Sequence, residues 1–373
     1  MVQVFSSIST AAVLFVTTAP NVDAKPGYGS VTRVDPTQYL RECVPAFKAG
    51  SFSKYINSYS NYWLIGEPSG LCMAAMSCPF IQCDGGNSSD VLDTLREVDL
   101  STVKFNDISD KLPPLNLPAY ISFPKGVRDI ISGVRYAKMK GRSISVKTSG
   151  HSYSGSSTME GSLQLNLRDF SKQSHNTHQS VSLCDSSSAT PGCKLAAARN
   201  KTATIRVSGN ELWDDVYRAV DDWNRRVSGN GSGLNLYEIV GGAAGTVSAA
   251  GGWLMGGGLG KGSDRLYGFG VDQLVEMEMV LADGSHVKFG PTEWVDQGPK
   301  MLHPQTTKVE GLCNHRPKND PSQWRWGHCR TKKAGFFKNL WKAVRGGGGG
   351  TFGIITAVEY QLHPQRLARA PVG

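Results

Sequence analysis

A glycine-rich loop with one histidine at its centre, Lys147–Ser157, is the feature that most restricts how this chain can fold. It reads Lys-Thr-Ser-Gly-His-Ser-Tyr-Ser-Gly-Ser-Ser and lies between two short β-like runs, 143–146 and 163–167. Its two glycines permit positive φ and close approach of the backbone to a ligand. Successive backbone N–H groups and serine hydroxyls in such a turn form an anion site. We therefore expect a pyrophosphate-binding loop at the end of a sheet, with His151 beside the bound group.

A second cluster of small residues occupies 241–258. Glycine and alanine here are non-repetitive and are interrupted by the apolar run Trp253-Leu254-Met255, so the cluster suits a backbone packed against a flat ligand better than a flexible linker. A P-loop is excluded because Gly260-Lys261 is followed by glycine instead of serine or threonine. No register fits the Gly-x-Gly-x-x-Gly fingerprint of a Rossmann fold.

A third glycine cluster, Gly346–Gly350, lies between a predicted helix, 337–345, and a strongly apolar predicted strand, 351–360. The three clusters together resemble the vanillyl-alcohol oxidase family, whose FAD-binding domain is named after p-cresol methylhydroxylase. The Ser-Gly-His-Ser-Tyr-Ser-Gly loop and the Leu-Trp-Lys-Ala-Val-Arg-Gly-Gly-Gly-Gly-Gly-Thr-Phe-Gly-Ile-Ile-Thr stretch are most similar to the berberine-bridge-enzyme-like branch.

This resemblance implies an α+β fold, the two-subdomain FAD-binding domain of the p-cresol methylhydroxylase type, with subdomains near 115–170 and 200–363. It implies FAD as the cofactor, joined covalently to His151 through the flavin 8α-methyl group. Some relatives have a second link through a cysteine, but Ala243–Val247 contains none, so we expect a single linkage. The residues expected to contact FAD are Ser149, Gly150, His151, Ser152, Tyr153, Ser154, Gly155, Gly241, Gly242, Thr246, Val247, Ala250, Gly251, Gly252, Gly257 and Ile354.

The chemistry implied by the resemblance is oxidation of a small alcohol or carbohydrate, with oxygen as the electron acceptor. We assign no general base, because the family's catalytic residues lie largely in a substrate domain that follows the strand at Ile354-Ile355-Thr356. That domain and the family's closing C-terminal segment are absent from this sequence. The alternative is therefore a flavin-binding domain, or a fragment, without catalytic turnover.

The expected organisation begins with a signal peptide, 1–24, because Ile8–Val16 is apolar but too short to span a bilayer and Val22-Asp23-Ala24 suits cleavage. No other stretch is long and apolar enough to cross a membrane, and we expect a secreted protein. The further segments are a disulfide-braced extension, 25–114; the FAD-binding domain, 115–290; an insertion rich in Cys, Trp and basic residues, 291–335; a closing helix and strand, 336–363; and a tail, 364–373.

Eight cysteines fit an oxidising compartment, in which the sequons at Asn87, Asn200 and Asn230 would be glycosylation sites. We expect the local pairs Cys184–Cys193 and Cys313–Cys329, whereas the pairing of Cys43, Cys72, Cys78 and Cys83 stays open. Cys313, His315, His328 and Cys329 are also ligand types for zinc, but their spacing matches no closed site, so we predict no metal.

The net charge of +9 is compatible with an anionic partner, although a solvated basic surface is the simpler interpretation. The chain has no arginine-rich arm and no nucleic-acid-binding motif. We therefore expect a small-molecule substrate and oxygen as partners, with neither nucleic acid nor membrane. The oligomeric state cannot be predicted from these patterns.

Hydrophobic periodicity predicts a β-α-β unit from strand 119–124, helix 127–140 and strand 144–146. Further along, it predicts a strand at 202–207, a helix at 210–222, and a hairpin whose turn is Ala282–Ser285. The Ser-rich stretch 171–200 is typical of an inserted surface loop. Asp272, before the hairpin, is expected to hold its loop in place structurally.

Overall fold

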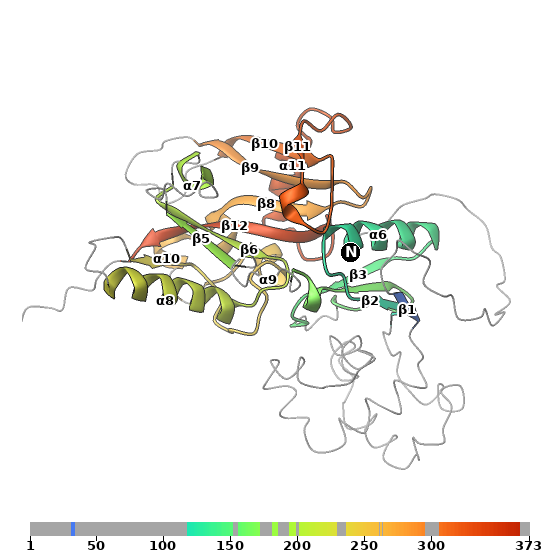
Figure 1. Cartoon of the computed structure of the whole chain (residues 1–373), viewed down its shortest axis with the longest axis horizontal. Helices are drawn as coiled ribbons and strands as arrows, with labels where there is room; N and C mark the ends of the chain where they lie inside the picture. The colour runs from blue at the N-terminus through green and yellow to red at the C-terminus, as the bar shows by residue number, and fades with distance from the viewer. Residues whose placement is uncertain are drawn as a thin grey trace, which may run out of the picture. The chain divides into compact units, whose positions relative to one another are not determined.

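The structure is a computed structural model that describes residues 31–33, 118–151, 156–171, 181–185, 194–198, 201–229, 236–260, 262, 264–294 and 306–365. The chain divides into two compact units (Figure 1). The first ends at Asp169 and also includes Ala282–Gly284, and the second takes Phe170–Leu281 and Ser285–Gly373. The division falls beside the boundary near residue 170 that was expected between the two subdomains.

Several predictions concern residues outside the described ranges. They are the signal peptide, all of the 25–114 extension except 31–33, Ser152–Gly155 of the histidine loop, and residues 366–373 of the tail. The same holds for Cys43, Cys72, Cys78, Cys83, Cys193, Asn87, Asn200 and Asn230. Among the described helices, none has the length and apolar character needed to cross a bilayer.

The first unit contains a four-stranded sheet in the order β1-β2-β4-β3. The strands are β1 (Val31–Arg33), β2 (Tyr120–Ser122), β3 (Ile144–Lys147) and β4 (Leu163–Asn166). Strand β4 is parallel to both β2 and β3, and β1 is antiparallel to β2. The predicted β-α-β unit is confirmed, since helix α6 (Val127–Met139) connects β2 to β3.

Helix α6 forms because its sequence supplies a start, an apolar face and a stop. Asp129 accepts hydrogen bonds from the N–H groups of Lys125 (2.9 Å) and Gly126 (3.2 Å), which caps the first turn. Its buried face includes Val127, Ile130, Ile131 and Val134. Gly141, at φ +61°, ends the helix. A Cβ atom at Gly133 would lie 2.8 Å from Leu165, so this glycine allows close packing between α6 and β4.

The second unit is built around an eight-stranded antiparallel sheet in the order β11-β10-β9-β8-β12-β6-β5, with β7 paired to β12. The strands are β5 (Val181–Asp185), β6 (Ala203–Ser208), β7 (Tyr237–Glu238), β8 (Leu274–Val280), β9 (His286–Trp294), β10 (Thr306–Asn314), β11 (Trp326–Gly327) and β12 (Ile354–Pro364). Figure 1 shows β12, the last strand of the chain, running between β8 and β6.

The core of this unit lies on the apolar face of the sheet. Met277 and Met279 of β8 belong to it, while Glu276 and Glu278 alternate with them and face the opposite side. Two longer helices contribute buried side chains, α8 (Trp213–Gly229) through Trp213 and α11 (Phe336–Val344) through Trp341. Five short helical segments are described in this unit: α7 (Lys194–Ala198), α9 (Gly252–Met255), α10 (Asp264–Tyr267), η4 (Gly270–Gln273) and η5 (Pro321–Gln323).

The interpretation of residues 171–200 as an inserted surface loop was wrong for residues 181–185, which form a strand of the main sheet. Strand β5 pairs along its whole length with β6, and a short helix, α7 (Lys194–Ala198), follows it. The polar composition obscured this strand because it lies at the edge of the sheet, where only alternate residues such as Val181 and Leu183 pack against the core. Helix α8 also extends further than the predicted end at Asp222.

The segment expected as an insertion, 291–335, continues the main sheet. Strand β9 runs to Trp294, and β10 and β11 then add two further strands beside it. The Cys313–Cys329 disulfide is confirmed, with the two Cα atoms 5.0 Å apart. This bond excludes zinc coordination by the two thiolates, which was the open alternative. Cys184 is also disulfide-bonded.

Candidate functional site

The histidine loop begins where β3 ends at Lys147. Ser149 and Gly150 are buried, and Gly150 has φ +83°, the positive value that the sequence predicted. His151 is half-buried, and its burial lowers the pKa of the imidazole from 6.5 to about 4. The ring is therefore neutral at physiological pH and carries a lone pair on one nitrogen.

The loop begins with a buried lysine, Lys147, which the sequence analysis did not single out. It is 1% exposed, and burial together with the charge of Arg168 lowers the pKa of its ammonium from 10.5 to about 7. Lys147 is therefore only partly charged near neutral pH, and it lies three residues before Gly150. The sequence signal that could have identified it is its position as the last residue of a largely buried strand.

The second glycine cluster packs against the start of α8. The N–H of Trp213 donates to the carbonyl of Val247 at 3.0 Å, and that of Asp214 donates to the carbonyl of Gly245 at 2.9 Å. A Cβ atom at Gly245 would overlap the carboxylate of Asp214, so no larger residue fits this packing. The cluster is therefore a tightly packed backbone and not a linker.

Gly242 lies among aromatic side chains. A Cβ atom there would be 2.9 Å from Trp213 Nε1 and 3.1 Å from Trp253 Nε1. The Tyr217 hydroxyl donates to the Gly242 carbonyl at 2.5 Å, and burial, with the nearby charge of Asp214, raises the pKa of Tyr217 to about 12. The hydroxyl thus stays protonated and holds the glycine backbone in position.

This packing leaves two buried backbone donors without a backbone partner. Among the described residues, the N–H groups of Gly241 and Gly242 make no backbone–backbone hydrogen bond, and both residues are buried. Three buried side-chain atoms nearby also lack a partner there, namely Asn210 Oδ1, Trp213 Nε1 and Ser248 Oγ. Because buried polar groups are normally satisfied, the N–H groups of Gly241 and Gly242, the Trp213 indole and the Ser248 hydroxyl fit a ligand rich in acceptor atoms, such as a dinucleotide pyrophosphate. Asn210 Oδ1 would instead accept a hydrogen bond.

The five-glycine run meets the second cluster. The N–H of Gly348 donates to the carbonyl of Met255 at 3.0 Å, and a Cβ atom at Gly349 would lie 3.5 Å from the Cα of Gly252. Gly346, Gly348 and Gly350 all have positive φ. The sequence analysis recognised this run as a family motif but assigned it no contact, whereas the structure brings it beside Gly252.

Asp272 has the structural role that was predicted. Its carboxylate accepts from Arg345 Nη2 at 2.7 Å and from the Phe269 N–H at 3.0 Å, and Arg345 Nε donates to the Val271 carbonyl at 3.1 Å. The ion pair fixes the end of α11 against the η4 segment. The ion pair therefore also fixes the position of the residue from which the glycine run starts.

The predicted site residues divide between the two units. Ser149, Gly150 and His151 belong to the first unit, and Ser152–Gly155 lie outside the described residues. Ile354, at the start of β12, is 2% exposed and pairs with Val280. The second unit also holds Gly241, Gly242, Thr246, Val247, Ala250, Gly251, Gly252 and Gly257.

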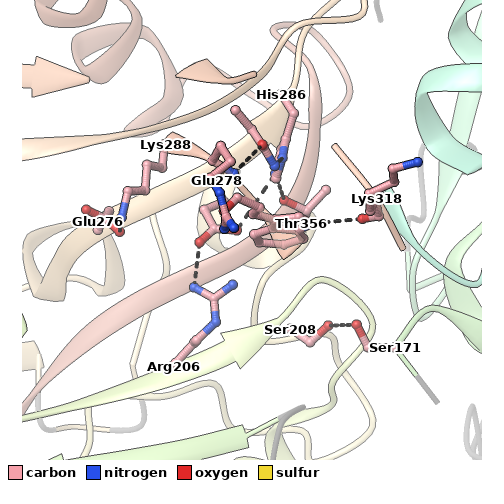
Figure 2. Close-up of polar contacts among 12 residues, drawn as sticks. Ser171, Arg206, Ser208, Glu276, Glu278, His286, Lys288, Lys318 and Thr356 are labelled. Carbon is pink, nitrogen blue, oxygen red and sulfur yellow. Dashed lines mark hydrogen bonds and ion pairs between the residues drawn. The ribbon is translucent and has the colours of Figure 1, made fainter. Parts of the chain in front are cut away.

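A network of charged side chains covers the polar face of the large sheet (Figure 2). Arg206 on β6 pairs with Glu278 on β8 at 2.8 Å, and Lys288 on β9 lies 3.7 Å from Glu276. Glu359 on β12 stands opposite both Arg206 and Glu276 in the strand register. Burial, with the charges of Glu276 and Glu278, raises the pKa of Glu359 to about 7.

His286 occupies the other end of this network and is 1% exposed. Asn314 Oδ1 accepts from two backbone N–H groups, so its amide nitrogen is the donor to His286 Nδ1 at 3.2 Å. His286 Nε2 therefore carries the proton and donates to Thr356 Oγ1 at 3.3 Å. Burial lowers the pKa of this histidine to about 4. In the described residues, no group of His, Cys, Asp and Glu side chains is arranged to hold a metal ion.

Comparison with known proteins identifies what this arrangement resembles. The family model for an FAD binding domain matches residues 118–290. The FAD-linked oxidoreductase ffsJ of Aspergillus flavipes is 26% identical over 251 residues, which are 67% of this chain and 30% of that protein. The VAO-type flavoprotein oxidase VAO615 of Thermothelomyces thermophilus is 26% identical over 263 residues, 70% of this chain and 33% of that protein.

Among solved structures, the VAO-type flavoprotein MtVAO615 from Myceliophthora thermophila aligns with a TM-score of 0.46 and 20% identity, over 90% of this chain and 45% of that one. A berberine bridge enzyme variant aligns with a TM-score of 0.42 and 18% identity, over 67% and 35%. The chain spans about a third of the length of the curated relatives it matches. The family match and the relatives agree with the resemblance drawn from the sequence and with an α+β FAD-binding fold.

Proposed function

We propose that the chain is the flavin-binding part of an FAD-dependent oxidase, because the family model for an FAD binding domain matches residues 118–290. The observation that carries the proposal is the pair of buried N–H groups of Gly241 and Gly242, which make no backbone–backbone hydrogen bond among the described residues, beside the unpartnered Trp213 Nε1. Backbone N–H groups of this kind can bind a pyrophosphate without contacts from side chains.

The residues proposed to hold FAD come from three glycine clusters. Ser149–Gly155 and the 241–252 backbone take the pyrophosphate, and Gly257 and Ile354 complete the set. We propose to add Gly348 and Gly349 to this set, since the five-glycine run lies against Met255 and Gly252. At Gly241, Gly242 and Gly245 a small residue is needed because a Cβ atom would meet Trp213 or Asp214.

His151 is proposed to form a covalent bond between one ring nitrogen and the 8α-methyl carbon of FAD. Its neutral imidazole, kept so by burial, leaves a nitrogen lone pair for that bond. We propose that this is the one protein–flavin bond, because Ala243–Val247 contains no cysteine.

When bound, FAD supplies the two-electron oxidation of a substrate carbon–hydrogen bond. We propose a small alcohol or carbohydrate as the substrate and oxygen as the final acceptor. The chain's own part is to bind the cofactor, to keep the histidine neutral, and to hold the glycine backbone in position through Tyr217 and Asp214. The Cys313–Cys329 disulfide supports an oxidising compartment, and hence secretion.

The test is an absorption spectrum of the purified protein, followed by acid precipitation. We expect a flavin band that stays with the pellet, that His151→Ala releases into the supernatant, and that the exposed-histidine control His315→Ala retains. Flavin in the wild-type supernatant would keep FAD binding but refute the covalent bond. A folded protein that takes up no added FAD would refute the proposed site.

A second candidate is a flavin-binding domain without turnover, which the limited coverage of the curated relatives keeps open. Peroxide production on a panel of sugars and alcohols separates the two. Flavin-loaded protein that makes peroxide supports the oxidase, and flavin-loaded protein that makes none on the whole panel supports the second candidate.

A further inference from the structure

Most of the chain's net positive charge is accounted for by one stretch of the second unit, residues 306–342, which we call the basic segment. It contains nine Lys or Arg residues and two acidic residues, so it carries +7 of the chain's net +9. The segment comprises β10, η5, β11 and α11, which lie together in Figure 1. This concentration does not fit a basic character spread evenly over the surface.

Little of this charge is neutralised within the protein. Lys308 pairs with Glu310 at 2.8 Å, whereas Asp320 accepts from Ser322 N (2.9 Å) and Gln323 Nε2 (3.0 Å) and so caps η5. Seven cations of the segment have no carboxylate partner among the described residues, and all but Lys318 are exposed: Arg316, Lys318, Arg325, Arg330, Lys333, Lys338 and Lys342.

Three of these arginines are held on one rigid scaffold. Asn314 Oδ1 accepts from the backbone N–H groups of both Arg316 (2.9 Å) and Arg325 (3.2 Å). Arg330 follows Cys329, which the disulfide joins to Cys313, the residue before Asn314. The backbones of the three arginines are thus ordered before any ligand arrives, which reduces the entropic cost of binding.

The apolar side chains of the segment are turned towards the sheet. The rings of Trp324 and Trp326 lie 4.9 Å and 5.0 Å from the His286 ring, and Trp324 Nε1 donates to the Lys318 carbonyl at 2.7 Å. Leu312, at 39%, is the one exposed large hydrophobic residue of the segment among those described. The surface therefore offers cations to a partner and little that would insert into a bilayer.

We propose that the basic segment binds an anionic polysaccharide, through contacts of Arg316, Arg325 and Arg330 with sulfate or uronate groups. The planar guanidinium makes paired hydrogen bonds with carboxylate and sulfate oxygens. The disulfide within the segment indicates an oxidising compartment, where acidic polysaccharides are available as polyanions and nucleic acids are not the expected partner. This inference is independent of flavin binding.

The experiment measures binding of the full chain to heparin and to polygalacturonate at about 0.1 M salt, where exposed charges are only partly screened. The test variant is the triple Arg316→Gln, Arg325→Gln, Arg330→Gln. The control is the triple Arg218→Gln, Arg225→Gln, Arg226→Gln, which removes the same charge from the outer face of α8. Circular dichroism and the melting temperature establish that both triples fold.

We expect wild type and control to bind with similar Kd, and the test variant to bind at least about tenfold more weakly. Its plot of log Kd against log salt should lose a slope of about three, roughly one for each lost contact. Equal losses in both triples would show a response to net charge alone and overturn the proposal. So would absence of wild-type binding to either polysaccharide, or tighter binding to duplex DNA or to phosphatidylserine vesicles.

Discussion

Replacing Glu359 by glutamine should stabilise the protein at alkaline pH and leave it unchanged at acid pH. The carboxyl is 7% exposed, on the central strand β12, and its cross-strand neighbours are Arg206 on one side and Glu276 on the other. Burial, followed by the charges of Glu276 and Glu278, raises its pKa from 4.5 to about 7. The folded protein therefore keeps a proton that the unfolded chain has already released.

The sign follows from proton counts. Below pH 4.5 both states of the chain carry the proton, and Glu359 adds no pH dependence. Between pH 4.5 and 7 the unfolded state binds fewer protons than the folded state, so stability falls as pH rises. A rise from 4.5 to about 7 corresponds to a loss of about 3 kcal/mol above pH 7, at about 1.4 kcal/mol for each pH unit.

Glutamine keeps the shape of the side chain and cannot ionise, so it removes this loss. The assay is urea unfolding at 25 °C, followed by tryptophan fluorescence, at pH 4 and pH 8, with wild type and variant in the same flavin state. We expect Glu359→Gln to be up to about 3 kcal/mol more stable than wild type at pH 8 and within about 0.5 kcal/mol at pH 4. The control Glu293→Gln changes a carboxylate that is 61% exposed and should differ little from wild type at either pH. A stability difference that does not change with pH, or a variant less stable at pH 8, would refute the reasoning.

Three further predictions concern other parts of the second unit and one turn of the first. The pKa of His286 is lowered to about 4, so its contribution to stability is fully present above pH 6.5 and is lost as pH falls towards 4. His286→Gln should therefore reduce the loss of unfolding free energy between pH 6.5 and pH 4 by up to about 3 kcal/mol. A variant whose unfolding free energy falls with acid as steeply as that of wild type would contradict this assignment. Cys313→Ser with Cys329→Ser opens a loop with a sequence separation of 16 and should lower the unfolding free energy by about 3 kcal/mol, measured by urea unfolding against wild type with the disulfide intact. An unchanged unfolding free energy would contradict a stabilising role for this bond. Gly258→Ala places a Cβ atom 2.8 Å from the Gly270 Cα at φ +78° and should cost more than Gly284→Ala, at φ +80° with no atom nearer than 3.8 Å. Gly284→Ala measures the cost of a left-handed backbone alone, about 1–2 kcal/mol. Equal melting temperatures for the two variants would show that a Cβ atom at Gly258 causes no steric clash.

Local patterns predicted the elements whose apolar face is large. Helix α6, the strands on either side of it, and the hairpin of β8 and β9 all appear where the sequence placed them, because the apolar period and the turn residues agree there. The same agreement failed at β5, a short edge strand in a Ser-rich stretch, and the helix α8 ran past its predicted end. Weak patterns at edges carry little information about pairing.

In the candidate site too, local sequence predicted some residues and missed others. Gly150 required positive φ, and the motif in which it stands led to His151 and to FAD before any geometry was available. The motif did not disclose that Lys147 is buried with its pKa near 7, nor that Tyr217 and Asp214 hold the second glycine cluster. These residues act through packing, and a residue's sequence neighbours do not reveal its packing partners.

The sequence by itself therefore carried the resemblance to a flavoprotein family, the expectation of FAD and the order of the three glycine clusters, because each depends on residue types at short spacings. Only the tertiary structure decided that Gly348 lies against Met255, that residues 306–314 form a strand of the main sheet, and that Glu359 stands between Arg206 and Glu276. Periodicity specifies which face of a strand is apolar, but the choice of neighbouring strand depends on contacts between segments far apart in the chain. For that reason the charged network on the sheet and the disulfide-linked basic segment could be recognised only once the strands were paired.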